Sequence, residues 1–198
     1  MNILNLTKMV VVGLGLAISS MPTYAIDWVI DEHNSQLNFV SIKKIDIAEI
    51  HKFKKLQGSY DSQGQFTLDI DLASVDTNIP VRDDRLKNNF FEVSKFSSAK
   101  ITAMIDTDLV DAIAEGSNRL LTIDANLDLH GVSKPLTLDV IVTRLVGAKL
   151  SVVSVQPIII NANDFALTAG ISKLMELASL PSISQAVPVS FYLTLKLK

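Results

Sequence analysis

Apolar and polar residues alternate without a break in several long stretches of the chain. Between residues 65 and 72, single polar residues separate Phe66, Leu68, Ile70 and Leu72, and residues 121–129 and 187–197 repeat the alternation. Successive side chains of a strand point to opposite faces, so each stretch predicts a strand with one buried and one solvent-facing side.

Shorter segments complete the predicted sheet. Residues 26–30 and 36–42 predict an opening hairpin around a polar turn at 31–34. Residues 43–55 alternate imperfectly and predict either a bent strand or a loop. Gly58 and Gly64 bracket a polar hairpin end. Further strands are predicted at residues 99–109, 136–140, 150–156 and 158–160, with a turn at 130–135 joining the strand at 121–129 to its partner.

Two segments show helical features instead. The polar residues at 74–78 end the strand before them, and Pro80 suits the first position of a helical turn that runs to Lys87 and is anchored by Phe90 and Phe91. Within residues 170–179, apolar side chains recur every three or four positions until Pro181 ends the run. The sequence therefore predicts one or two short helices among the strands.

Eight or nine predicted strands with mostly short connections indicate an all-β domain, either an antiparallel barrel or a sandwich. Several strands are nine to eleven residues long, which is longer than most sandwich strands. Their outward faces carry Asp, Lys, Thr and Ser, which suit solvent. These features favour the antiparallel barrel.

Residues 1–25 have the pattern of a secretory signal peptide. Lys8 precedes an apolar segment at residues 9–18, and Ala25 provides the small residue of a cleavage site. The apolar segment has about half the length that a membrane span needs, and a retained N-terminal anchor is the alternative. Removing these 25 residues from the 198 leaves 173 residues, 26–198, which we expect to form one exported domain.

Composition and charge narrow the function. The chain has no cysteine and a net charge of −3, which excludes disulfides, thiol catalysis and a lipoprotein anchor and gives no basic footprint for nucleic acid. No segment after residue 25 predicts a membrane span. His33, His51 and His130 lack metal-ligand spacing, and no serine lies in a Gly-x-Ser-x-Gly turn. We therefore predict no metal, no cofactor and no enzymatic activity.

Several short motifs, in their order and spacing, resemble the YceI-like family of secreted bacterial proteins, over nearly the whole of residues 26–198. They are Asp31 to Phe39 with Asn34 between His33 and Ser35, Gly58 and Gly64, residues 74–77, Arg82-Asp83 with Leu86 and Phe90-Phe91, residues 121–123, and residues 130–135.

This resemblance implies an eight-stranded, antiparallel, lipocalin-like barrel in the periplasm, with an elongated apolar lumen that in some members holds a polyisoprenoid or a related long-chain lipid. Residues 161–166 depart from the family, because they read Asn-Ala-Asn-Asp-Phe-Ala where many members carry Arg-x-Asp-Phe-Gly. With the arginine and the glycine missing, the resemblance gives this loop no head-group role. We expect the helix at 171–178 to shape a different mouth.

The candidate ligand-binding residues are inward-facing apolar side chains and three polar residues at the mouth. Eight strands can enclose either packed side chains or one slender ligand, so the apolar set predicts a filled core or a lumen. Asp76, Arg82 and Asp83 are the mouth candidates, and a structural ion pair after Pro80 is their alternative role. The apolar candidates are Phe66, Leu68, Ile70, Leu72, Ile101, Ala103, Ile123, Leu127 and Phe191.

Our hypothesis is a periplasmic carrier that holds a long-chain isoprenoid or quinone-like lipid. The alternative is a non-enzymatic, stress-related interaction module with a filled barrel and no lipid ligand. The apolar face of the helix at 171–178 leaves three roles open: a lid, a contact with a second copy in a homodimer, or a contact with a membrane surface.

Overall fold

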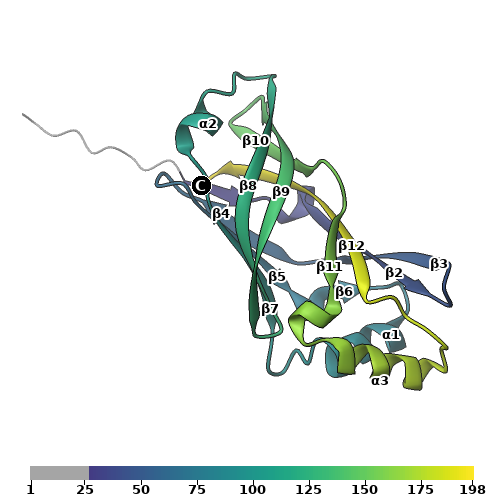
Figure 1. Ribbon diagram of the computed structural model, residues 1–198. Helices are drawn as coiled ribbons and strands as arrows, with labels where there is room; N and C mark the ends of the chain where they lie inside the picture. The colour runs from purple at the N-terminus through teal and green to yellow at the C-terminus, as the bar shows by residue number, and fades with distance from the viewer. Residues whose placement is uncertain (1–26) are drawn as a thin grey trace, which may run out of the picture.

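Eight antiparallel strands close into a barrel in this computed structural model, which describes residues 27–198. The ring runs β1, β4, β5, β7, β8, β9, β10 and β12, and β12 pairs with β1 to close it (Figure 1). The predicted barrel is thus confirmed, and the sandwich is not formed. The signal peptide predicted at 1–25 and the strand residue Ile26 lie outside the described residues.

Residues 27–198 contain twelve strands, three α-helices and four shorter helical turns. The strands are β1 (Trp28–Ile30), β2 (Gln36–Lys43), β3 (Ile47–Phe53), β4 (Leu56–Tyr60), β5 (Gln65–Asp71), β6 (Val75–Asp76), β7 (Ser98–Met104), β8 (Asn118–Leu129), β9 (Val132–Leu145), β10 (Lys149–Ser154), β11 (Ile158–Asn161) and β12 (Ala186–Leu197). The α helices are α1 (Pro80–Arg85), α2 (Thr107–Asp111) and α3 (Thr168–Ala178). The other helical turns are η1 (Glu32–Asn34), η2 (Leu72–Ser74), the π-helical η3 (Leu86–Phe90) and η4 (Ala162–Phe165).

β1 and β2 do not form the predicted opening hairpin. Both lie along the same edge of β12, where Ile30 pairs with Leu195 and Gln36 pairs with Tyr192. The turn η1 carries the chain forward instead of back, and the Ser35 hydroxyl oxygen accepts a hydrogen bond from the backbone N–H of β12 at 2.9 Å. The two segments therefore behave as one bent strand.

Local hydrogen bonding corrects two predicted boundaries. The strand predicted at 99–109 ends at Met104, because the Asp106 carboxylate caps α2 by accepting a hydrogen bond from Asp108 N at 3.0 Å. The turn predicted at 130–135 contains only His130 and Gly131, both with positive φ, so β9 begins directly after them.

Two further segments contain more strand than the sequence indicated. The ambiguous residues 43–55 form a hairpin, in which β3 pairs with β2 from Phe53–Leu37 to Ile47–Lys43. The polar corner predicted at 74–78 contains the short strand β6, which pairs with β3. The pairing of β6 with β3 holds the start of α1 beside the β2–β3 hairpin.

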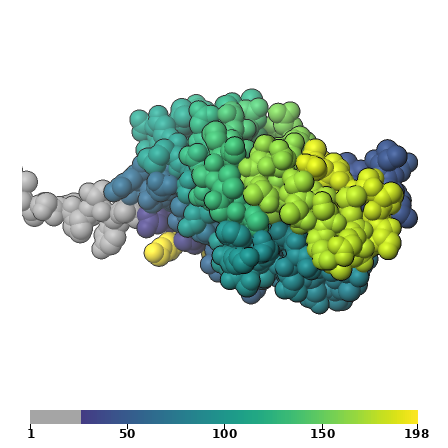
Figure 2. Space-filling view, turned by 60° about the horizontal axis from the view of Figure 1, so that its bottom comes forward, coloured from purple at the N-terminus to yellow at the C-terminus, as the bar shows by residue number. Residues whose placement is uncertain are grey.

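The helices lie at opposite ends of the barrel. α1, η3 and α3 gather at the end from which the β2–β3 hairpin projects, and α2 lies at the other end (Figure 1). Figure 2 shows residues of α3, in yellow-green, pressed against the teal segment that contains α1 and η3. At this contact, a Cβ added to Gly170 would come within 3.0 Å of the Phe90 Cα atom. No helix within residues 27–198 is long and apolar enough to cross a membrane.

Candidate functional site

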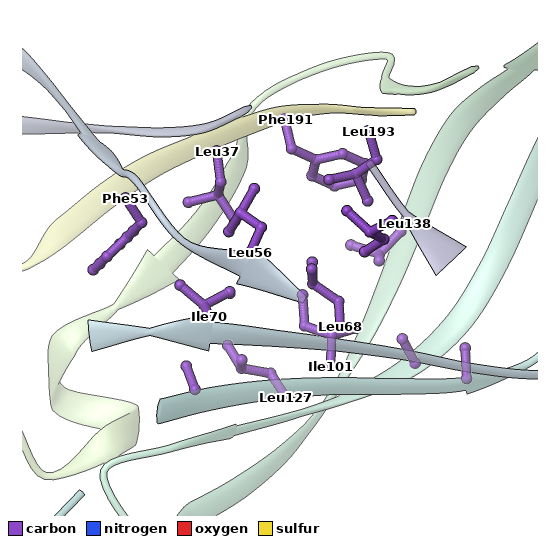
Figure 3. Packing of buried hydrophobic residues seen from close by; sticks show 14 of the residues in the cluster. Leu37, Phe53, Leu56, Leu68, Ile70, Ile101, Leu127, Leu138, Phe191 and Leu193 are labelled. Atoms are coloured by element: carbon purple, nitrogen blue, oxygen red, sulfur yellow. The ribbon is translucent and has the colours of Figure 1, made fainter. Parts of the chain in front are cut away.

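Two adjoining apolar chambers occupy the barrel interior, so its side chains do not fill it. The larger chamber has a volume of about 150 Å³ and lies beneath η3 and α3, whereas the smaller, of about 60 Å³, lies toward α2. Ile101, Leu138 and Phe191 line both chambers. Figure 3 shows Phe191 and Leu193 pointing from β12 across the interior toward Leu68 and Ile101. This level of the barrel therefore separates the two chambers.

The structure gathers all nine apolar candidates around these chambers. Their binding role stays a prediction, but their placement agrees with it, because alternation along each strand turns them inward. Ile70, Leu72 and Leu127 line the larger chamber, Phe66, Leu68, Ala103 and Ile123 line the smaller one, and Ile101 and Phe191 line both.

The larger chamber also has aromatic lining residues that were not among the predicted ligand-binding residues. Phe39, Phe53 and Phe91 lie in a row, with centroid separations of 5.3 Å and 5.7 Å between successive rings. The alternation within residues 36–42 could have identified Phe39. Phe53 could not be assigned to a face, because it lies in the segment whose pattern was ambiguous.

α3 covers the larger chamber with the apolar face that its spacing predicts. Ile171 and Leu174 both line the chamber, and Ile171 is buried. η3, which packs against α3, contributes Leu86 and Phe90. The chamber end is thus built from two helical segments that contact each other through Gly170.

The chambers offer very little polar chemistry. Ser41 and Ser184 are the polar side chains that line the larger chamber, and nearly all its surface is carbon. The smaller chamber has a surface of carbon alone, to which Tyr60 contributes its ring. Burial raises the pKa of Tyr60 to about 12, so its hydroxyl stays protonated. No charged side chain lines either chamber within residues 27–198.

The three predicted mouth residues lie around the start of α1 and line neither chamber. Asp76 contacts Lys54 at 3.1 Å. Arg82 donates hydrogen bonds to Glu49 Oε2 at 2.7 Å and to the Thr77 carbonyl at 2.8 Å.

Asp83 holds the same loop from the other side. Its carboxylate accepts hydrogen bonds from both the backbone N–H and the hydroxyl of Thr77, which is buried. Within the described chain Arg82 and Asp83 form no ion pair with each other, so the alternative structural role takes a different form from the predicted one. Both residues tie α1 to Thr77, and Arg82 ties it to Glu49 as well.

A buried histidine lies behind the polar edge of the larger chamber. His51 is 3% exposed, and its Nε2 atom lies 2.8 Å from the Ser41 hydroxyl, while Nδ1 is buried without a partner. Burial lowers the pKa of His51, and the nearby Arg82 charge lowers it further. The hydrogen bond from Lys43 holds the pKa of the neighbouring Glu49 below its usual range. Sequence reasoning missed this group because His51 and Glu49 lie in the ambiguous segment.

Comparison with known proteins gives one family. The model of the YceI-like domain matches residues 28–195. A polyisoprenoid binding domain from Saccharophagus degradans, implicated in plant cell wall breakdown, is 39% identical over 86% of this chain and 98% of its own, with a TM-score of 0.84. Comparison with curated protein sequences gives no significant match.

Two more distant structures share the fold. Burkholderia cenocepacia BcnA is 18% identical over 83% of this chain and 98% of its own, with a TM-score of 0.62. A Campylobacter jejuni YceI protein is 19% identical over 79% of this chain and 90% of its own, with a TM-score of 0.54.

Proposed function

The chain belongs to the YceI-like family, and from this premise we propose that it is a periplasmic, non-enzymatic carrier of one long-chain isoprenoid or quinone-like lipid. The observation that carries the proposal is the pair of adjoining apolar chambers along the barrel. The Saccharophagus degradans domain, which is described as polyisoprenoid binding, supports the same ligand class.

The chambers suit a slender hydrocarbon better than a compact ligand. An eight-stranded barrel leaves room for about one narrow chain along its axis. Each methylene that leaves water contributes roughly 0.8 kcal/mol, so chain length alone supplies affinity without any polar contact. The carbon surfaces of both chambers are therefore what such a ligand requires.

The lining of the two chambers also favours a carrier over an enzyme. General acid–base chemistry needs a titratable group within hydrogen-bond reach of the substrate. Among residues 27–198, the chamber linings offer hydroxyl groups but no carboxylate, lysine or imidazole. The signal-peptide pattern of residues 1–25 supports export as the route by which the carrier reaches the periplasm.

Native mass spectrometry of the protein released gently from the periplasmic fraction tests this proposal. We expect a discrete excess mass that leaves on organic extraction and is identified as an isoprenoid lipid, on a chain whose own mass corresponds to residues 26–198. A clean apo mass that persists after incubation with quinones and polyprenols would instead favour the interaction module without a lipid ligand.

A further inference from the structure

We propose that Ser41, oriented by His51, donates a hydrogen bond to a neutral oxygen atom of the bound lipid's head group, such as a quinone carbonyl or a polyprenol hydroxyl. This inference rests on the proposed function and goes beyond it, because it places the head group in the larger chamber. The site lies beside the β2–β3 hairpin, at the barrel end that α3 covers.

Ser41 is the available hydroxyl at this edge of the chamber. Ser184 lies beside it, since the Ser184 backbone N–H donates to the Ile42 carbonyl at 2.8 Å. The Ser184 hydroxyl is occupied, because it donates to the Ala186 carbonyl at 3.0 Å and accepts from the Ala186 N–H at 3.2 Å. Ser41, in contrast, has the His51 ring as its side-chain partner.

The tautomer of His51 decides what the Ser41 hydroxyl can do. A hydroxyl that donated to Nε2 would leave the proton on Nδ1, as a buried N–H without a partner. Buried N–H groups are rarely left unpaired, whereas unpaired acceptor atoms are tolerated more often. The favoured tautomer therefore carries its proton on Nε2 and donates it to Ser41, which leaves the serine O–H free for a ligand.

The surrounding charges select a neutral head group. Lys43 and Arg82 both contact Glu49 Oε2, at 2.6 Å and 2.7 Å, and the Asp83 carboxylate, which binds Thr77, is the second anion that acts on His51. The two cations are therefore balanced by two anions, and neither cation lines the chamber. A phosphorylated head group would need charge-assisted donors that the lining does not offer.

Chamber size places the head group at this end. A quinone ring or branched head requires the larger chamber, while the smaller one suits the narrow tail. The competing donor is Tyr60, whose hydroxyl is buried without a partner near α2. Because the smaller chamber has a surface of carbon alone, that hydroxyl does not face the ligand.

The test is a binding titration of the delipidated full protein with four ligands of matched chain length: a quinone, a polyprenol, a polyprenyl phosphate and a plain isoprenoid hydrocarbon. We expect Ser41→Ala to weaken quinone and polyprenol binding by about tenfold, the value of one hydrogen bond, and to leave hydrocarbon binding unchanged. Ser151→Ala, at a half-buried serine of β10 that lines neither chamber, is the matched control and should change neither. In wild type, the polyprenyl phosphate should bind more weakly than the polyprenol.

His51 is a positioning residue, and its variants need a second readout. His51→Leu should weaken quinone binding as Ser41→Ala does, while His51→Gln, whose amide can still donate to Ser41, should restore most of it. The carbonyl stretching band of the bound quinone should lie at lower wavenumber in wild type than in Ser41→Ala. This shift reports the hydrogen bond itself and does not depend on stability.

Four results would overturn the inference. Equal quinone affinity and an unshifted carbonyl band in Ser41→Ala would remove Ser41 from the site. Weakened quinone binding in Tyr60→Phe, with none in Ser41→Ala, would place the head group at the α2 end. Failure of wild type to bind any of the four ligands would reject the proposed function as well, whereas hydrocarbon binding with no preference for an oxygen would reject this inference alone.

Discussion

Arg82 joins helix α1 to strand β3 through a contact of 2.7 Å with Glu49. The same guanidinium donates to the Thr77 carbonyl, so it also holds the loop before the helix. Both side chains are only partly exposed, at 24% for Arg82 and 31% for Glu49. Arg82, which was predicted to lie at the mouth, thus directs both of its terminal nitrogens to protein groups, and only its buried Nε is left without a partner among the described residues.

Replacing Arg82 with methionine should therefore lower the free energy of unfolding by about 1–2 kcal/mol, because Glu49 and the Thr77 carbonyl each lose a donor. Urea unfolding measures the change. Lys87→Met is the matched control, since its contact with the exposed Asp84 is 4.0 Å long, and it should cost less than about 0.5 kcal/mol. If Arg82→Met kept the stability of wild type but lost lipid retention, Arg82 would have the predicted ligand-binding role at the mouth of the barrel instead.

A bulky side chain at Ala103 should distinguish an occupied lumen from a filled core. Ala103 is buried and lines the smaller chamber. We expect Ala103→Phe to fill this chamber at little cost in stability and to weaken the binding of long-chain lipids more than that of short ones. Calorimetric titration with quinones of increasing chain length measures the effect.

The control for Ala103→Phe lies on the same strand. Lys100→Phe adds a ring on the solvent-facing side of β7 and should leave the chain-length dependence unchanged. A loss of about 1–3 kcal/mol in the free energy of unfolding of Ala103→Phe, with no change in ligand preference, would indicate an overpacked core instead.

The pH dependence of stability should report the burial of His51. Its folded pKa lies below the ordinary 6.5, so on acidification the unfolded chain takes up a proton before the folded protein does. The stability contribution is present above about pH 6.5 and is lost as the pH falls toward the lower folded pKa. We expect His51→Gln to flatten the fall in stability as the pH drops below about 6.5.

The pH range in which His51 affects stability is separate from the range in which the carboxylates do. Glu49 has a lowered pKa, so its contribution is lost only below its ordinary value of 4.5. His33→Gln, at an exposed position in η1, serves as the control for the loss of a histidine. If the stability of His51→Gln and that of wild type fell equally steeply between about pH 6.5 and 4.5, the result would contradict a folded state that keeps His51 neutral.

The strand pattern predicted the barrel wall well, because alternation reports which side of a strand is buried. Leu68, Ile70 and Ile101 face the interior as their spacing predicted. Alternation does not report strand pairing, so β1 and β2 were predicted to pair with each other although both pair with β12. The conformation of η1 determines whether β2 folds back on β1 or continues along β12, and the polar sequence of this turn is compatible with both.

The polar edge of the chamber could not be predicted for a different reason. Ser41 and His51 meet because β2 and β3 pair with Phe39 opposite His51, a register that the irregular segment between them did not reveal. Asp76, Arg82 and Asp83 were predicted as mouth residues because they form a charged cluster on either side of Pro80. A cluster of charged side chains indicates that they need polar partners, but not whether the protein or a ligand supplies them. Here the protein itself supplies them.

Ala166 occupies a backbone conformation that suits glycine, with φ of 56° directly after η4. The family pattern carries a glycine at this point, after Asp-Phe, and left-handed backbone costs an alanine roughly 1–2 kcal/mol. Because the side chain is exposed, Ala166→Gly removes strain without opening a cavity, and we expect it to raise the free energy of unfolding by about 0.5–1 kcal/mol.

Ala166→Val is the opposing control, since a β-branched residue is still less tolerant of positive φ and should destabilise the protein. Both changes are measured by urea unfolding, together with lipid retention, which neither should alter. If Ala166→Gly left stability unchanged but altered lipid binding, the missing glycine would belong to the ligand site. The expected result instead assigns that glycine to the backbone path that leads from β11 into α3 and sets the helix over the chamber.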